Sequence, residues 1–493
     1  ATGCSHDTPT PSPEPPVKGG EFNEFGFTTT APVTLSVDYG DMAGMPANVY
    51  FEVYDTCPVE ETETAYAKIA GVEPLYAGYT DGQGRFEGTI ELPAYIRKAY
   101  VLTPAFYART LLEATRSGDM LTASAESGAP ANAAPASTRA KEYHSTAVER
   151  DGWKTWLGSY DTTYGSIGYE YDGDLKVKNY GALLKAHASV FDTTKKCPKE
   201  YRSSRDLYLE KSAEVVITLL GSNTCWNSSM GYYYYKTGNK PKSLADANVV
   251  MIFPNTQDGR WSNSPWESRL YQGVERGTAV QLIYYPEIAD GSKAGATTVF
   301  PADYRIGFVL ATNAWTNRLR AGDKKYRAAT SDGLSVNNNG VAYQTPRTAV
   351  FRYTDKKSGI NSVLFSFEDH TNDENFSDVV FTMTSNPVDA VTDIPSVDVN
   401  DGKKTANVLR GIYAFEDLWP SRGDYDMNDV MVRSDYEKVF NEKGVFEESF
   451  MLKTFANFAG NANGLAVTLT GAAADAKLEF SVRKPGAETF EAA

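Results

Sequence analysis

Short runs of alternating apolar and polar side chains follow one another through the first hundred residues. Examples are residues 34–37, 48–54 and 75–79. Because alternate side chains of a strand point to opposite faces of a sheet, this period of two predicts half-buried strands. An Asp-Gly turn at 80–84 precedes a further alternating run at 86–92, as expected for a hairpin. We therefore predict a strand-rich domain over residues 21–110.

The composition changes abruptly after this domain. Residues 111–145 are dominated by Ala, Ser, Thr, Gly and Pro, which favour an extended, unpacked chain. A helix starting at 111–116 would be ended by the Gly and Pro residues that follow it. The sequence therefore predicts a linker over 111–145.

Strand patterns return over residues 146–390, where β-branched and aromatic residues gather in short runs. These runs lie at 213–220, 231–236, 249–253, 280–285 and 305–310. One segment, 176–191, has apolar residues at helical spacing and is predicted to be a helix. The whole chain is therefore predicted to be all-β, a multidomain tandem β-sandwich or jelly-roll architecture with few helices and a last domain over 400–493.

Four consecutive tyrosines stand at 232–235. Since alternate side chains of a strand point in opposite directions, we expect two rings to face the core and two to face outward. The outward rings are suited to stacking on sugars, although a Tyr-rich strand of a sandwich is the simpler interpretation.

The net charge limits the kinds of partner that the chain can bind. The 493 residues include 48 Lys and Arg against 63 Asp and Glu, a formal net charge of −15. Binding to nucleic acid or to an anionic membrane surface depends on clustered basic residues, so neither is expected. The sequence has no stretch of about 18 apolar residues that could span a membrane. The four histidines lie far apart, which leaves no local zinc motif.

The N-terminus resembles the end of a bacterial lipoprotein signal peptide. Small residues precede Cys4, and a polar, Pro-rich run follows at 8–17. The resemblance implies a lipid on Cys4, a tether over 1–20 and a location at the outer membrane or cell surface, with the membrane contacted only through that lipid. An ordinary N-terminus with an incidental cysteine fits the Pro-rich run equally well.

Three further cysteines are Cys57, Cys197 and Cys225. An odd number allows at most one disulfide among them. Cys197 with Cys225 is the pair we predict, and two free buried thiols are the alternative.

The most informative feature is an acidic pattern that occurs twice, at 364–381 and at 413–432. In each copy an aromatic-rich strand ends in Phe-Glu-Asp, a polar loop follows, and a closing Asp leads directly into a second apolar strand. The candidate metal ligands of the first copy are Glu368, Asp369, Asp373, Asn375 and Asp378. Those of the second copy are Glu416, Asp417, Asp424, Asp426, Asn428 and Asp429.

Calcium is the cation that suits such loops. Ca²⁺ takes about six to eight oxygen ligands, which closely spaced carboxylates and carboxamides between two strands can supply. Without a cation these carboxylates would repel one another. The alternative is that the Asp and Asn side chains only cap backbone amides of the turns. A catalytic pair, Glu368 with Asp378 or Glu416 with Asp429, would need a sugar-sized cleft, and we do not expect an enzyme.

Three segments resemble known families. The strand order over 30–108, with its Tyr-Thr-Asp-Gly-x-Gly turn, resembles the transthyretin-like or carboxypeptidase-regulatory-like β-sandwich. The first acidic copy, with 231–235 and 300–310, resembles a secreted bacterial domain ending in Phe-Glu-Asp…Asn-Asp-Val-Val-Phe, which implies an association with calcium; Ser377 stands where Asn is usual. The second copy resembles the opening of the LruC domain of Bacteroidetes and spirochaete lipoproteins, and we expect that domain to be incomplete here.

The LruC resemblance implies a cell-surface or periplasmic β-rich protein. From the acidic loops and the N-terminus we predict a non-catalytic, calcium-binding cell-surface lipoprotein that serves adhesion or surface assembly, with other surface proteins or glycans as partners. The alternative is a carbohydrate-binding surface lipoprotein that captures glycans on exposed aromatic side chains. The candidate platforms are Trp261, Trp266 and Trp315.

Overall fold

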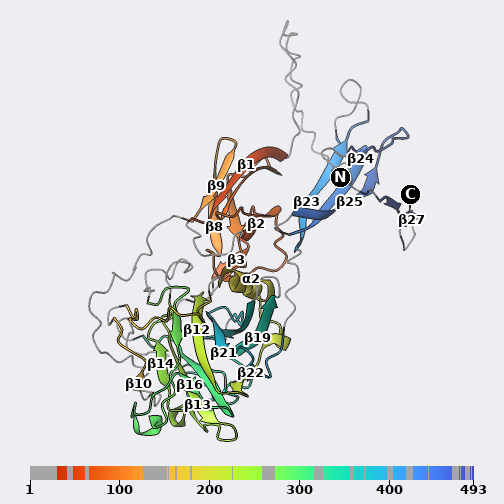
Figure 1. Ribbon diagram of the computed structural model, residues 1–493. Helices are drawn as coiled ribbons and strands as arrows, with labels where there is room; N and C mark the ends of the chain where they lie inside the picture. Colours follow the sequence, from red (N-terminus) through yellow and green to blue (C-terminus); the bar gives the residue numbers. More distant parts are fainter. Residues whose placement is uncertain are drawn as a thin grey trace, which may run out of the picture. The chain divides into compact units, whose positions relative to one another are not determined.

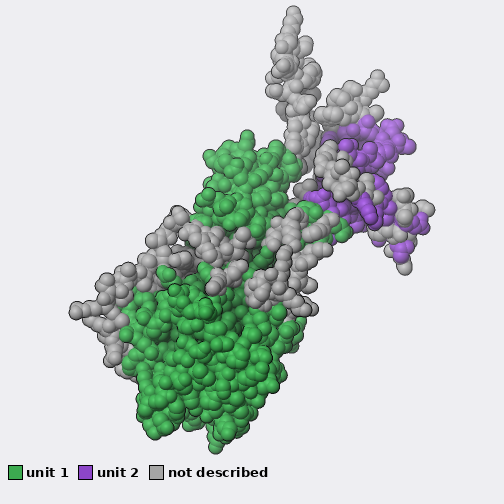
Figure 2. All heavy atoms as spheres, viewed as in Figure 1, with its two compact units in different colours: residues 1–408, 438–447 green, residues 409–437, 448–493 purple. Residues whose placement is uncertain are grey.

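The prediction of an all-β chain is confirmed, because the described residues form several sheets and a single α-helix (Figure 1). The computed structural model describes residues 30–40, 48–61, 66–125, 153, 155–161, 164–177, 180–224, 226–257, 273–315, 326–355, 360–370, 373–396, 404–417, 426–441, 444–468, 477, 479–483, 489 and 491–492. The chain divides into two compact units, residues 1–408 with 438–447 and residues 409–437 with 448–493 (Figure 2).

Residues 30–125 of the first unit form a seven-stranded sheet, called here the N-terminal sheet. Its strand order is β5-β2-β7-β8-β9-β1-β6. The strands are β1 (Thr30–Asp38), β2 (Tyr50–Tyr54), β5 (Tyr76–Tyr79), β6 (Arg85–Pro93), β7 (Lys98–Leu102), β8 (Leu111–Ser117) and β9 (Met120–Ser124), beside a small hairpin of β3 (Val59–Glu61) and β4 (Tyr66–Lys68). Alternation builds this sheet: Val33, Leu35 and Val37 of β1 are buried, while the residues between them are partly exposed.

The linker predicted for 111–145 is wrong over its first part. Residues 111–124 form β8 and β9, and β9 pairs in parallel with β1. Small side chains misled the prediction, because Ala114 and Ala123 alternate with polar residues and are fully buried beside Leu112 and Leu121. A period of two therefore outweighed a linker-like composition. The rest of the predicted linker, 126–145, lies outside the described residues.

Residues 153–396, called here the central sandwich, form two facing sheets. One has the order β10-β14-β13-β17-β11-β22 with β18 beside β17, and the other β15-β12-β21-β20-β19 with β16 beside β12. The strands of the first sheet are β10 (Thr155–Trp156), β11 (Leu207–Leu209), β13 (Ser229–Lys236), β14 (Val250–Phe253), β17 (Tyr304–Ala311), β18 (Arg327–Ala329) and β22 (Val391–Thr392). Those of the second are β12 (Ala213–Ser222), β15 (Ala279–Gln281), β16 (Val299–Phe300), β19 (Thr348–Asp355), β20 (Ile360–Phe367) and β21 (Val379–Asn386).

Aromatic rings join the two sheets of the central sandwich. Phe308 of β17 lies 5.2 Å from Phe365 of β20 and 5.0 Å from Phe381 of β21, measured between ring centroids. Such ring pairs add about 0.5–1.5 kcal/mol each to the burial of their area. The acidic loop between β20 and β21 is thereby attached to a rigid core.

The helix predicted for 176–191 is confirmed as α2 (Tyr180–Val190). Leu183 and Leu184 face the core, and His187 is fully buried as a packing residue. Short 3-10 turns occur at Lys199–Tyr201, Leu244–Asp246 and Ile288–Asp290. In the described part of the chain, no helix is both long enough and apolar enough to cross a membrane.

Both faces of the tyrosine-rich strand β13 are covered, which corrects the prediction of two outward rings. Tyr232 is buried in the core between the sheets, and Tyr233 is buried on the opposite side in a second cluster with Trp315. The hydroxyls of Tyr234 and Tyr235 donate to Tyr285 O and to Asp206 Oδ2, each at 2.7 Å. Two rings of the run are therefore buried, and the other two are half-buried with their hydroxyls bonded inside the sandwich.

The second unit contains most of a three-stranded sheet, β23 (Lys404–Phe415), β24 (Val430–Asn441) and β25 (Gly444–Asn457), followed by the pair β26 (Ser481–Val482) and β27 (Glu491–Ala492). In this sheet β24 lies between the other two strands. The second acidic loop connects β23 to β24, as its sequence pattern predicts.

Cys197 is a free, buried thiol, which corrects the predicted disulfide with Cys225. Its Sγ donates to Pro198 O at 3.3 Å, and burial raises the pKa of the thiol to about 12. Cys225 itself, like Cys4, lies outside the described residues.

Candidate metal centre

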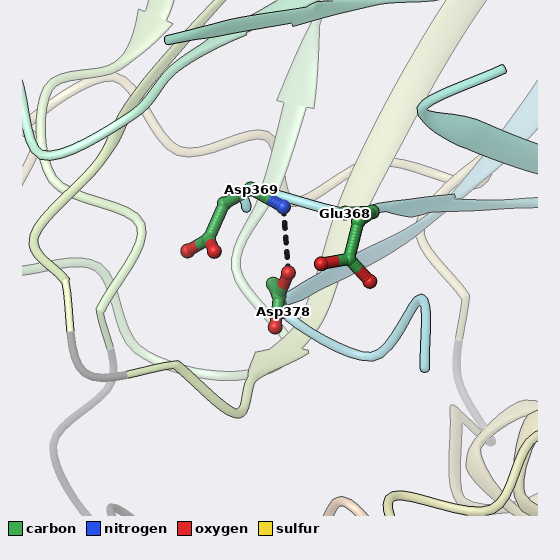
Figure 3. A group of neighbouring side chains, drawn as sticks. All are labelled: Glu368, Asp369 and Asp378. Atoms are coloured by element: carbon green, nitrogen blue, oxygen red, sulfur yellow. Dashed lines mark hydrogen bonds between the residues drawn. The ribbon is translucent and has the colours of Figure 1, made fainter. Parts of the chain in front are cut away.

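The first acidic loop is closed by the pairing of β20 with β21. Phe367 at the end of β20 lies opposite Val379 at the start of β21. Because the ladder ends there, Glu368 and Asp378 are the next residues on either side and must lie close together. Carboxylate oxygens of Glu368, Asp369 and Asp378 all lie within 4.8 Å of one another (Figure 3).

Backbone amides fix the carboxylates of this loop. Asp369 N donates to Asp378 Oδ2 at 2.6 Å, and Phe376 N donates to Glu368 Oε2 at 3.2 Å. Ser377 N donates to Asn375 Oδ1 at 2.6 Å, which forms an Asx turn before the closing acid. Phe376 has a left-handed φ of 60°, and its fully buried ring anchors the strained turn in the core.

The three clustered acids are buried almost completely, with exposed fractions of 1% for Glu368, 4% for Asp369 and 3% for Asp378. Burial raises the pKa of Glu368 well above its ordinary value, and the nearby Asp373 raises it further. Burial and the charge of Asp369 raise the pKa of Asp378 in the same way. Burial raises the pKa of Asp369 to about 7, although a hydrogen bond from Thr224 opposes the rise. The ionised cluster is therefore unfavourable without a compensating positive charge.

Asp373 and Asn375, the remaining candidates of the first copy, complete the loop. Asn375 Nδ2 donates to Asp373 Oδ2 at 2.7 Å, so the amide orients the fourth carboxylate. Burial also raises the pKa of Asp373, and a hydrogen bond from the neighbouring Glu368 carboxyl lowers it. The four acids named as candidate ligands thus share one loop with a fifth, Glu374.

Arg347, which the sequence analysis missed, supplies one positive charge to this cluster. Its Nη2 lies 3.3 Å from Glu368 Oε1, and both side chains are buried. Neither of these two atoms has a hydrogen-bond partner among the described residues, although they form an ion pair. The face of the Tyr343 ring lies 4.9 Å from the guanidinium carbon and holds it in place. Arg347 Nη1 also lies 3.9 Å from Glu374 Oε1, so the guanidinium is shared with a fifth acid and leaves the four candidate ligands with excess negative charge.

The second acidic loop repeats the backbone design of the first. Asp417 N donates to Asp429 Oδ2 at 2.8 Å, just as Asp369 N donates to Asp378. Asn428 N donates to Asp426 Oδ1 at 3.3 Å, which repeats the Asx turn. The left-handed residue, Met427 with a φ of 56°, again stands two positions before the closing acid.

The two loops differ in burial. Oxygens of Glu416, Asp417 and Asp429 also lie within 4.8 Å of one another, but all three side chains are half-exposed. Asn461 Nδ2 donates to Asp417 Oδ2 at 2.8 Å from outside the loop. Asp426 is exposed, and Asp424 lies outside the described residues. The second loop therefore resembles the first in geometry but lies in a wetter environment.

The donor set fits a hard cation. Every candidate ligand in the two clusters is a carboxylate oxygen, the ligand that Ca²⁺ and Mg²⁺ prefer. Turn capping explains Asp378 Oδ2 and Glu368 Oε2, which accept backbone amides. Capping leaves the repulsion among the carboxylates unrelieved, since the counter-charge at Glu368 Oε1 is the single guanidinium of Arg347, 3.3 Å away and without a hydrogen bond. A bound divalent cation would complete the neutralisation.

The repulsion in the first loop predicts a pH dependence of the metal-free chain. In EDTA, the free energy of unfolding should fall more steeply between about pH 5 and pH 7.5 for the wild type than for Asp378→Asn. Acids whose pKa is raised by folding bind more protons in the folded state, so their contribution is lost as the pH rises through the folded pKa. For Asp369 this window runs from 3.8 to about 7.

Urea unfolding at both pH values measures the difference between the two proteins. His187, whose pKa is lowered by burial to about 3, acts in the opposite direction. Its contribution is common to both proteins and cancels in the comparison. Equal slopes in the wild type and the variant would contradict the repulsive cluster.

Replacement of Arg347 should change stability and calcium affinity in opposite directions. Arg347→Met should cost the metal-free chain about 3 kcal/mol or more, because it leaves buried carboxylates unpaired. It should also tighten calcium binding about tenfold, since a unit charge of the same sign as the ion is removed from a site of low effective dielectric constant.

Unfolding in EDTA and calorimetric titration measure the two effects. Arg352→Met is the matched control, because Arg352 donates to Asn361 Oδ1 and Val391 O and does not contact the acids. An unchanged calcium affinity in Arg347→Met would show that Arg347 does not act on the site.

Comparison with known proteins gives two partial matches. A family model described as a domain of unknown function (DUF8469) matches residues 31–125. A second, described as a domain of unknown function (DUF4114), matches residues 300–386. No curated protein matches the chain, and neither does any solved structure. The first match spans all the strands of the N-terminal sheet except the first residue of β1, and the second includes the first acidic loop. Neither description assigns a function.

Proposed function

We propose that the chain is a non-catalytic calcium-binding protein whose first acidic loop is the stronger site. The observation that carries the proposal is the burial of three carboxylates within 4.8 Å of one another, with a fourth acid in the same loop. Isolated ionised carboxylates are costly to bury, and one guanidinium does not balance four of them. A divalent cation removes this imbalance.

The arrangement favours Ca²⁺ over Mg²⁺. Mg²⁺ requires near-ideal octahedral geometry, usually keeps several waters and uses one or two protein carboxylates. The first loop gathers three carboxylates almost closed to solvent and a fourth, Asp373, that is half-buried. Ca²⁺ accepts more ligands in a less regular arrangement and so suits a turn whose shape is set by strand pairing.

A catalytic role for the first pair of acids has less support. Glu368 and Asp378 are buried and held by backbone amides, so no sugar can lie between them as glycoside hydrolysis requires. The glycan-capture alternative is weakened as well, because Trp315 is only 1% exposed. Trp261 and Trp266 lie outside the described residues.

The biological setting that we propose is a lipid anchor on Cys4 at the outer membrane or cell surface, with adhesion or surface assembly as the role. Support comes from the small residues before Cys4 and the Pro-rich run after it. The net charge of −15 agrees with a protein that attracts divalent cations and avoids polyanions. Surface proteins or glycans are the partners that such a role would need.

Calcium should raise the melting temperature of the full chain relative to EDTA. A ligand that binds only the folded state adds about 2.7 kcal/mol of stability at one hundred times its dissociation constant. Asp378→Asn should remove most of the rise and Asp429→Asn a smaller part. Mg²⁺ at the same concentration should give less stabilisation.

Thermal melts of the three proteins measure these shifts. Asp389→Asn serves as the control, since Asp389 is exposed and pairs with Lys211 away from both loops. If millimolar Ca²⁺ leaves the wild-type melting temperature unchanged, the proposal fails and the acidic side chains act as turn caps.

A further inference from the structure

The first acidic loop also contacts a segment of the central sandwich that packs against the N-terminal sheet. This segment, residues 191–202, follows α2 and is called here the bridging segment (Figure 1). Its Phe191 belongs to one buried cluster that includes Phe106 of the N-terminal sheet and Phe376 of the acidic loop. The loop, the bridging segment and the N-terminal sheet therefore share one core within the first unit.

One residue of the bridging segment is hydrogen-bonded in both directions. Thr193 N donates to Pro104 O of the N-terminal sheet at 3.1 Å. Thr193 O accepts from Asn375 Nδ2 at 3.2 Å, and the same amide donates to Asp373 Oδ2 at 2.7 Å. A chain of polar contacts thus runs from Asp373, through Asn375 and the backbone of Thr193, to the loop between β7 and β8.

A second connection runs through α2. Ser366, two residues before Glu368, shares a 2.8 Å hydrogen bond with His187 Nε2. The His187 ring meets the ring of Phe106 edge to face, with centroids 4.6 Å apart. Both connections end on residues 104–106. A change in the position of the acidic loop would therefore act on this one place, the loop between β7 and β8.

Charge holds the outer side of the loop against the bridging segment. Glu374 Oε2 lies 3.4 Å from both Lys196 Nζ and Arg202 Nη1. Glu374 O accepts from Cys197 N at 2.7 Å, and the guanidinium carbon of Arg202 lies 5.3 Å from the Phe376 ring. Glu374 thus pairs with the bridging segment, whereas the four candidate ligands, three of them buried, remain for the cation.

We propose that a cation in the first acidic loop fastens the N-terminal sheet to the central sandwich. This inference rests on the proposed calcium site and states what calcium binding there does to the contact between the N-terminal sheet and the central sandwich. Repulsion among the carboxylates opposes the closed loop, and the closed loop is what positions Asn375 toward Thr193, directly after the strand in which Ser366 meets His187. Neutralising the acids therefore stabilises the contacts that end on residues 104–106.

Hydrogen exchange of the full chain tests this consequence. In Ca²⁺ the amides of 103–110 should exchange about tenfold more slowly than in EDTA, because local opening there becomes less favourable. Residues 80–92 lie in the same sheet but away from the bridging segment, and their exchange should not change. Calorimetric titration on the same samples reports whether calcium is bound.

Asn375→Asp separates binding from coupling. The new carboxylate keeps an oxygen for the Ser377 amide and for the cation, but it has no donor for Thr193 O. This variant should bind Ca²⁺ and lose the slowing at 103–110. Asn239→Asp, the same change in an exposed turn, should behave as the wild type.

The outcomes distinguish the two proposals. Calcium binding without slower exchange at 103–110 overturns the coupling and leaves the calcium site standing. Full slowing in Asn375→Asp shows that the amide is not the connection and also overturns it. If titration detects no binding to the wild type, both proposals fail together.

Discussion

The pairing of β20 with β21 is the constraint on which the candidate site depends. Once Phe367 lies opposite Val379, the chain has no freedom to keep Glu368 and Asp378 apart. The rings of Phe365 in β20 and Phe381 in β21 stack with their centroids 4.8 Å apart, which stabilises this register. The packing of the core thus holds like charges close together. A bound cation is the simplest way to relieve the repulsion between them.

Much of this arrangement could be predicted from the sequence because it is local. A period of two identified β1, β2, β5 and β6 of the N-terminal sheet, and the Phe-Glu-Asp endings located both acidic loops. Where the prediction failed, composition had been given more weight than periodicity. Ala114 and Ala123 occur in a stretch with the composition of a linker, yet their spacing buries them in β8 and β9. The prediction of outward tyrosines was wrong for a different reason. The sequence does not show that a second cluster covers the other face of β13.

The residues that the sequence did not reveal are those that reach the site from far along the chain. Thr224 contacts Asp369 across 145 positions, and Thr193 contacts Asn375 across 182. Arg347 is nearer in sequence, but it lies beyond a hairpin and carries no local pattern that marks it as a partner of Glu368. Such contacts depend on strand order, which a single sequence leaves open. They decide the charge balance of the site and its connection to the N-terminal sheet.

The two acidic loops show why a repeated motif need not give equal sites. Both use a closing Asp to accept the amide after the Glu, and both place a left-handed residue two positions earlier. Only the first is buried, where electrostatic interactions are stronger because water does not screen them. Its acids therefore repel more strongly without a cation and attract one more strongly than the half-exposed acids near Asp429. Burial also packs the first loop against its neighbours, so a cation bound there would act on packing more than one bound by the half-exposed acids. The same sequence pattern thus yields a candidate site linked to the core in one place and a half-exposed candidate in the other.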